Sequence, residues 1–202
     1  MSAKLFVEGG GDSKELHTRC REAFRKLLEK AGFVGHMPRI VACGARIAAY
    51  GDFCTALRVA PTENSVLLVD SESPVDGTPW SHVETGDAWP RPGGATDDQL
   101  QFMVVCMESW VLADRNALKR VFGMGLRVSS LLPEENLESR TKDDVQRSLA
   151  SATRDCGRDR CYRKGRRSFL VVSELDPAIL KKRLPHFQRL ILILNQYLAP
   201  AA

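Results

Sequence analysis

The N-terminal third of the sequence alternates short apolar runs with longer segments of helical periodicity, and this alternation restricts the fold more than any other feature. Apolar runs at residues 4–7, 38–43 and 66–69 predict strands. Between them, residues 12–32 and 46–59 place apolar side chains at helical spacing, which predicts two helices. The resulting order of strands and helices is typical of a parallel sheet with right-handed crossovers.

The rest of the sequence predicts a long loop followed mostly by helices. Residues 71–94 are rich in Pro and Gly and predict an irregular loop. Trp80 and Trp89 are expected to anchor this loop to the domain, with stacking on nucleic-acid bases as the alternative. Residues 101–107 predict a strand and residues 109–122 a helix. Further helices are predicted at residues 141–154, 176–183 and 185–198.

We therefore expect an α/β protein with a mostly parallel central sheet flanked by helices. Residues 1–122 are expected to form the α/β core, and residues 123–202 a helical C-terminal extension packed on it in a single compact unit. The apolar face of the last helix is expected to belong to the core, with a homodimer seam as the alternative.

The composition is that of an ordinary globular protein. No secretory signal is visible, and the longest apolar run is far too short to span a bilayer, so we expect a cytoplasmic protein without a membrane partner. The six cysteines are scattered and are interpreted as small core residues. Cys156 and Cys161 lack the two further ligands that a zinc site needs.

Acidic residues follow two of the predicted strands. Glu8 comes directly after the first strand, and Asp70 and Glu72 follow the third. The carboxyl ends of parallel strands share one edge of the sheet, and carboxylates brought together there repel one another unless a cation is bound. Hard oxygen ligands suit Mg²⁺ or Mn²⁺, so we predict a divalent metal site, with Glu108 as a fourth member. Any one of these acids alone would be interpreted as a helix cap, and Asp12 is expected to be one.

Two other segments suggest phosphate binding. Residues 154–167 carry seven basic residues and two acids, which indicates either a solvated loop or a segment that contacts phosphates, through Arg163, Lys164, Arg166 and Arg167 in particular. The turn Gly9-Gly10-Gly11 can cradle phosphate, which leaves nucleotide binding as an alternative. This turn lacks the Lys-Ser/Thr ending of a P-loop and the spacing of a dinucleotide site.

The acidic segments resemble those of a known group of proteins. Val7-Glu8-Gly9, followed by Asp12, resembles the first motif of Toprim domains, and Val69-Asp70-Ser71-Glu72 resembles their second motif, with Glu72 where Asp is usual. A further Asp of that pattern is absent or displaced to Asp76. Residues 107–114 and 162–165 resemble a Toprim-like bacterial family of unknown function, often found beside ATPases in phage-defence loci. Its distant relatives are the overcoming-lysogenization-defect nucleases.

The resemblance implies phosphodiester hydrolysis on nucleic acid, with Mg²⁺ or Mn²⁺ as cofactor. Glu8 would act as general acid/base, Asp70 and Glu72 would hold the metal, and Glu108 would complete a second metal site. Lys164 and the nearby arginines would offset the charge of the phosphate. DNA is the expected substrate rather than RNA, and an ATPase partner is expected to regulate the reaction. The alternative is a binding or effector module that keeps the fold without catalysis.

Overall fold

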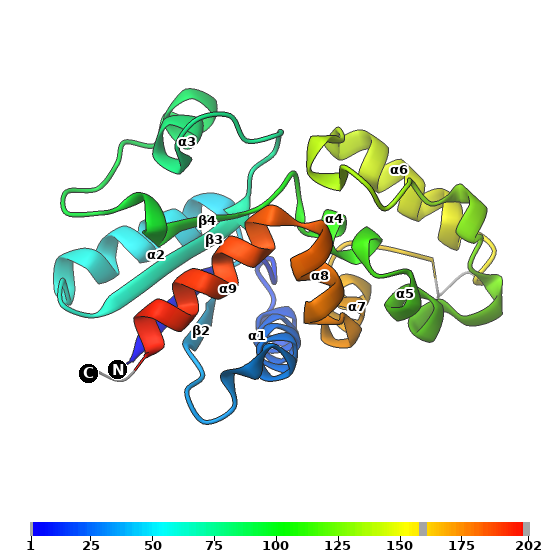
Figure 1. The fold of residues 1–202 in the computed structure, drawn as a ribbon, viewed down its shortest axis with the longest axis horizontal. Coiled ribbons are helices and arrows are strands. Elements are labelled where there is room, and N and C mark those ends of the chain that lie inside the picture. The colour runs from blue at the N-terminus through cyan, green and yellow to red at the C-terminus, as the bar shows by residue number, and fades with distance from the viewer. Residues whose placement is uncertain (1, 158–160, 200–202) are drawn as a thin grey trace.

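The structure, a computed structural model, describes residues 2–157 and 161–199. Its centre is a four-stranded parallel sheet in the order β2-β1-β3-β4. The strands are β1 (Ala3–Val7), β2 (Arg39–Ala42), β3 (Asn64–Asp70) and β4 (Leu100–Met103). The apolar residues of β3 are fully buried, as expected for a central strand covered on both faces (Figure 1). The predicted α/β class with a parallel sheet is confirmed.

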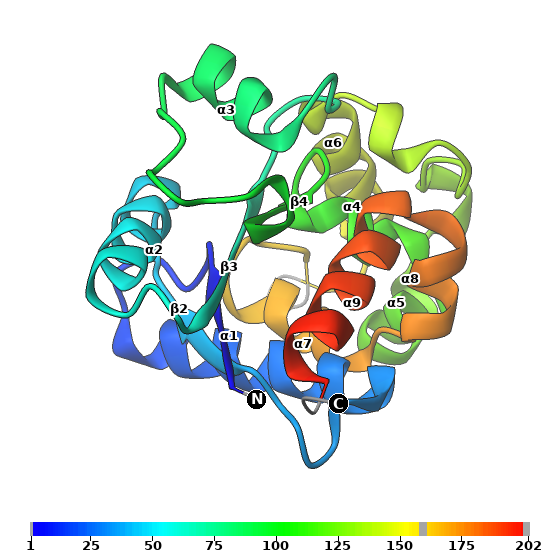
Figure 2. The ribbon, with the colours of Figure 1, turned by 60° about the vertical axis from the view of Figure 1, so that its left-hand side comes forward.

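Helices cover both faces of the sheet. The helix α2 (Arg46–Val59) lies on one face, and α1 (Lys14–Leu28), continued by a π-helical segment (Glu29–Phe33), lies on the other together with α9 (Pro185–Leu198) (Figure 2). The helices α1 and α2 cover opposite faces because the right-handed crossovers from β1 to β2 and from β2 to β3 run in opposite directions across the sheet. Asp12 does not cap α1, because the cap is Ser13, whose hydroxyl accepts the backbone N–H of Leu16 at 3.4 Å.

The predicted loop at residues 71–94 was wrong in part, because it contains a helix, α3 (Pro79–Asp87). Thr78 caps this helix and Pro79 occupies its first turn, where the missing N–H of proline costs nothing. Trp80 and Trp89 are both buried, so they anchor the segment as expected. Trp89 stacks on Tyr50 of α2 with their ring centroids 4.5 Å apart.

The predicted helix at residues 109–122 is two helices, α4 (Met107–Ala113) and α5 (Arg115–Phe122). The break lies at Asp114, whose side chain accepts the backbone N–H groups of Asn116 and Ala117 and so starts a new helix. The predicted strand at residues 101–107 was too long, since β4 ends at Met103 and α4 begins at Met107.

The C-terminal part is helical and packs on the sheet and on α1. Its helices are α6 (Lys142–Thr153), α7 (Arg166–Glu174), α8 (Pro177–Arg183) and α9. The helix α9 packs along β4, and α7 packs along α1. Trp110 of α4 is fully buried between Phe24 of α1 and Phe187 of α9. The predicted division of the chain at residue 122 stays a prediction.

The apolar face of α9 is buried within the chain, so its assignment to the core is confirmed. Within residues 2–157 and 161–199, none of the helices has the length and apolar character that a membrane span requires.

Candidate metal centre

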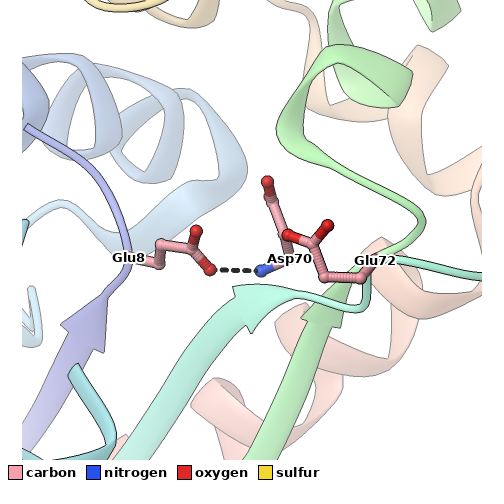
Figure 3. Close-up of side chains that lie close together, drawn as sticks. All are labelled: Glu8, Asp70 and Glu72. Atoms are coloured by element: carbon pink, nitrogen blue, oxygen red, sulfur yellow. Dashed lines mark hydrogen bonds between the residues drawn. The ribbon is translucent and has the colours of Figure 1, made fainter. Parts of the chain in front are cut away.

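Three carboxylates meet at the carboxyl edge of the sheet. Glu8 follows β1, Asp70 is the last residue of β3, and Glu72 lies two residues further on. The strands β1 and β3 are neighbours, with Val7 opposite Leu68, which places Glu8 beside Asp70. One carboxylate oxygen from each residue lies within 4.8 Å of the other two. In Figure 3, Glu8 reaches from β1 toward Asp70, and Glu72 lies on the other side of Asp70.

Backbone hydrogen bonds hold two of these side chains in place. The backbone N–H of Asp70 donates to Glu8 Oε2 at 2.9 Å, and the N–H of Met107 donates to Asp70 Oδ1 at 2.8 Å. Each carboxylate keeps its second oxygen for a ligand. The exposed Glu72 has a left-handed backbone, with φ 66°, and this turns the chain back toward the site after β3.

Two carboxyl groups of the site, those of Glu8 and Asp70, have a raised pKa. Burial raises the pKa of Asp70 well above its usual range, and the nearby charges of Glu8 and Glu108 raise it further. Burial also raises the pKa of Glu8, which the hydrogen bond from Asp70 and the charge of Arg46 offset only in part. A bound cation would favour the ionised form of both groups.

The residues present fit a divalent cation of the hard class. Ligand oxygens around an octahedral Mg²⁺ ion lie about 3 Å apart when adjacent and about 4.2 Å apart when opposite, so oxygens that already lie within 4.8 Å of one another can close on the ion. Among the residues that the structure describes, these three acids form the one group with this geometry. The oxygens move closer together on binding, and the exposed Glu72 exchanges its ion pair with Lys142 for the cation.

Two cations that the sequence analysis missed lie against the acids. Lys142, at the start of α6, has its Nζ 2.5 Å from both carboxylate oxygens of Glu72 and 3.9 Å from Asp70 Oδ2. Arg46, at the start of α2, donates to the backbone oxygen of Asp70 at 2.9 Å and lies 3.8 Å from Glu8 Oε2. Arg46 also pairs with Asp87 and stacks on Trp89, which links the segment after β3 to the site.

Glu108 is fully buried beside this group but outside the triad. Its Oε1 accepts the hydroxyl of Tyr162 at 2.8 Å. Its Oε2 has no hydrogen-bond partner among the described residues, and Lys164 Nζ lies 3.9 Å away. A buried carboxylate oxygen without a partner is costly, so this oxygen is suited to receive a ligand. Burial and the charge of Glu108 both raise the pKa of Tyr162.

A cavity of about 310 Å³ opens beside the acids. Glu8, Asp70, Glu108 and Lys164 line it, together with the glycine turn. Glu72 is not part of the lining. The N–H of Gly9 donates to the oxygen of Gly44, and this use of the amide weakens the alternative in which the turn cradles a phosphate.

Only part of the basic segment, residues 154–167, is a loop, and only part of it lies at the site. Its end forms the first turn of α7, which contains Arg166 and Arg167. Arg163 and Arg166 are exposed, Arg167 is half-buried, and only Lys164 of the predicted set lines the cavity. Arg158 and Arg160, which belong to the predicted segment, lie outside the described residues.

The sequence did not predict Arg46, Lys142 or Tyr162 at the site, and of these only Arg46 has a sequence signal that places it near the acids. Arg46 follows β2, so it starts a helix at the same sheet edge as the acids. Lys142 and Tyr162 come from elements remote in sequence, and no spacing rule connects them to the strands. His82 is half-buried, and its Nε2 lies 2.9 Å from the backbone oxygen of Ser71.

Replacing Lys142 with methionine is expected to increase the affinity for Mg²⁺ about two- to fivefold, as for the loss of a partly exposed ion pair. The ammonium group occupies both oxygens of Glu72 and repels an incoming cation. Isothermal titration calorimetry with MgCl₂ measures the change. Lys181→Met, on α8, removes an equal charge from an exposed lysine outside the group and should leave the affinity unchanged. A lower affinity in Lys142→Met would show instead that Lys142 positions Glu72 for the metal.

A comparison with known families matches nearly the whole chain. The model of a "Domain of unknown function (DUF4276)" matches residues 7–195, a range that includes every residue of the site described above. No curated protein and no solved structure matches the chain.

Proposed function

The chain belongs to the DUF4276 family, a family of unknown function, and we propose that it hydrolyses phosphodiester bonds in nucleic acid with Mg²⁺ or Mn²⁺ as cofactor. The observation that carries the proposal is the convergence of Glu8, Asp70 and Glu72 at the sheet edge. A cavity with a lysine in its lining lies directly beside them. Carboxylates for metal and a cation for phosphate are the groups that phosphoryl transfer needs.

Each acid has a role that follows from its position. Asp70 and Glu72, with Glu8, would hold one cation, and the unpartnered oxygen of Glu108 would serve a second. When bound, the metal supplies Lewis-acid chemistry, polarising the phosphate and making a water molecule easier to deprotonate.

Side chains of the protein would carry out the proton transfer and the charge compensation. Glu8 would accept the proton of the attacking water while the new P–O bond forms and the bond to the leaving sugar oxygen breaks, and that oxygen takes up a proton from solvent. A general base works best with a pKa near the working pH, and burial moves the pKa of Glu8 upward in that direction. Lys164 Nζ, on the cavity wall, offsets the charge that builds on the phosphate oxygens.

Cleavage assays test the proposal. The purified protein is incubated with supercoiled plasmid, single-stranded DNA and RNA, with MnCl₂ or with EDTA. We expect cleavage of DNA with Mn²⁺ only, and a loss of at least about a thousandfold in the double variant Glu8→Ala/Asp70→Ala. Activity that persists in the double variant would contradict the assignment of the site.

One observation favours a second candidate function. The ion pair of Lys142 with Glu72 supplies a positive charge from within the chain, as in a binding module that keeps the fold and needs no metal. Titration with Mg²⁺ and Mn²⁺ separates the two candidates. A chain that binds neither ion, by calorimetry or by a shift in melting temperature, would be the binding module.

A further inference from the structure

A groove with a cavity volume of about 120 Å³ lies between α1 and α7 and carries mostly positive charge. Arg19 and Lys26 of α1 line it from one side, and Arg166 of α7 lines it from the other. Glu22 is the one acid among the lining residues. We propose that this groove binds the sugar–phosphate backbone of the nucleic acid strand that enters the acidic cavity. The inference rests on the proposed function, because it names the path of that substrate.

The groove adjoins the cavity at the acids. Phe169 of α7 lines both. Arg166 faces the groove only two residues after Lys164, which faces the cavity, and Gly165 between them lines the cavity as well. A strand whose phosphate lies next to Lys164 would therefore continue directly between α7 and α1.

The charges of the groove are available for a ligand. Lys26 and Arg166 form no ion pair with any residue of the described ranges. Arg19 pairs with Glu15 of the same helix, with Nη2 and Oε1 2.9 Å apart, and Glu15 is well exposed. Exposed pairs of this kind contribute little to stability, so a phosphate can replace Glu15 at small cost. Phosphate contacts of Lys and Arg dominate the affinity of proteins for nucleic acid.

The dimensions suit a strand rather than a compact ligand. The groove is much smaller than the pockets of about 300–1,000 Å³ that enclose small molecules. Arg19 and Lys26 are seven residues apart on α1, which corresponds to about 10.5 Å along the helix axis. Phosphates three nucleotides apart on one strand are separated by about 10 Å along the axis of duplex DNA. Two cations spaced in this way can contact different phosphates of one strand.

The groove is tested by measuring the affinity for nucleic acid under conditions that prevent cleavage. The affinity of the full chain for a fluorescein-labelled single-stranded DNA is measured by anisotropy in EDTA over a series of NaCl concentrations, and duplex DNA and RNA are measured in parallel. The variant is Arg19→Gln/Lys26→Gln. The control, Arg21→Gln/Arg25→Gln, removes the same charge from exposed positions of the same helix that do not line the groove. Melting temperatures verify that both variants fold.

We expect the groove variant to bind single-stranded DNA about tenfold more weakly, with a salt slope smaller by about 1.4, because two phosphate contacts are lost. The control should bind like the wild type, and Arg19→Lys/Lys26→Arg should restore most of the affinity. Equal binding by the groove variant and the control would overturn the inference, as would a wild type that binds no nucleic acid.

The nuclease proposal and the groove proposal can each be overturned without the other. Wild-type cleavage together with unchanged binding in the groove variant overturns the groove and leaves the nuclease standing. Binding through the groove by a protein that neither binds metal nor cleaves overturns the nuclease and leaves the groove standing.

Discussion

The Asp70→Asn variant is expected to lose the stabilisation by Mg²⁺ and yet to be more stable than the wild type in EDTA at pH 8. Metal that binds only the folded wild type at about 100 times its Kd adds about 2.7 kcal/mol to the free energy of unfolding. That corresponds to about 5–10 °C in melting temperature for a chain of this size. The variant lacks the best-held carboxylate of the triad and should show little of this increase.

The gain in EDTA follows from the pKa of Asp70. Burial, then the charges of Glu8 and Glu108, raises the pKa in the folded state above the value of about 3.9 found in unfolded chains. The stability contributed by the protonated form is therefore complete below pH 4 or so and is lost as the pH rises through the raised pKa. Asparagine does not ionise and still accepts the N–H of Met107, so the advantage of the variant should grow from pH 5 to pH 8.

Thermal unfolding at both pH values, with EDTA and with MgCl₂, measures these changes. Asp76→Asn is the control, because Asp76 is an exposed acid of the segment after β3 and lies outside the triad. It should behave like the wild type in all four conditions. Equal stabilisation of wild type and Asp70→Asn by Mg²⁺ would remove Asp70 from the metal site.

Replacing Asp114 with alanine is expected to lower the free energy of unfolding by about 3–4 kcal/mol, because a helix cap and a further buried acceptor are lost together. Asp114 is fully buried at the break between α4 and α5. Its Oδ1 accepts the N–H groups of Asn116 and Ala117, each at 3.0 Å, and its Oδ2 accepts that of Asp176 at 2.9 Å. Alanine leaves all three donors without this acceptor.

Urea unfolding, followed by tryptophan fluorescence and circular dichroism, gives the free energy. Thr141→Ala is a matched control, because Thr141 caps α6 at an exposed position, where its hydroxyl accepts the N–H of Asp144 and donates to the carboxylate of the same residue. Its cost should be about 1 kcal/mol. A cost for Asp114→Ala no larger than that of the control would mean that water replaces the buried acceptor.

Local signals explain which elements could be predicted. The bounds of α2 and α9 agree with the sequence, and α9 has a regular apolar pattern. The predicted parallel sheet followed from short apolar runs separated by helices. The helix α3 was missed because Pro79 was interpreted as a breaker, although Thr78 followed by Pro is a start signal. The helix α7 was missed because its first residues are basic and its buried residues Phe169, Val171 and Val172 form only a short apolar stretch.

The ATPase partner, the homodimer and the preference for DNA over RNA stay predictions. So do the catalytic roles of Glu8 and Lys164 and the contacts of Arg163, Arg166 and Arg167 with substrate. The structure determines their positions, and the experiments above determine their roles.

The sequence by itself determined the parallel sheet and placed Glu8, Asp70 and Glu72 at one edge of it, because the carboxyl ends of parallel strands share an edge. The structure brought the three acids together, because β1 and β3 are neighbours in the sheet. Only the tertiary structure decided what surrounds them. Lys142 and Tyr162 reach the site from elements far along the chain, and the groove joins α1 to α7. Such contacts depend on how helices pack on one another, which leaves no fixed spacing in the sequence.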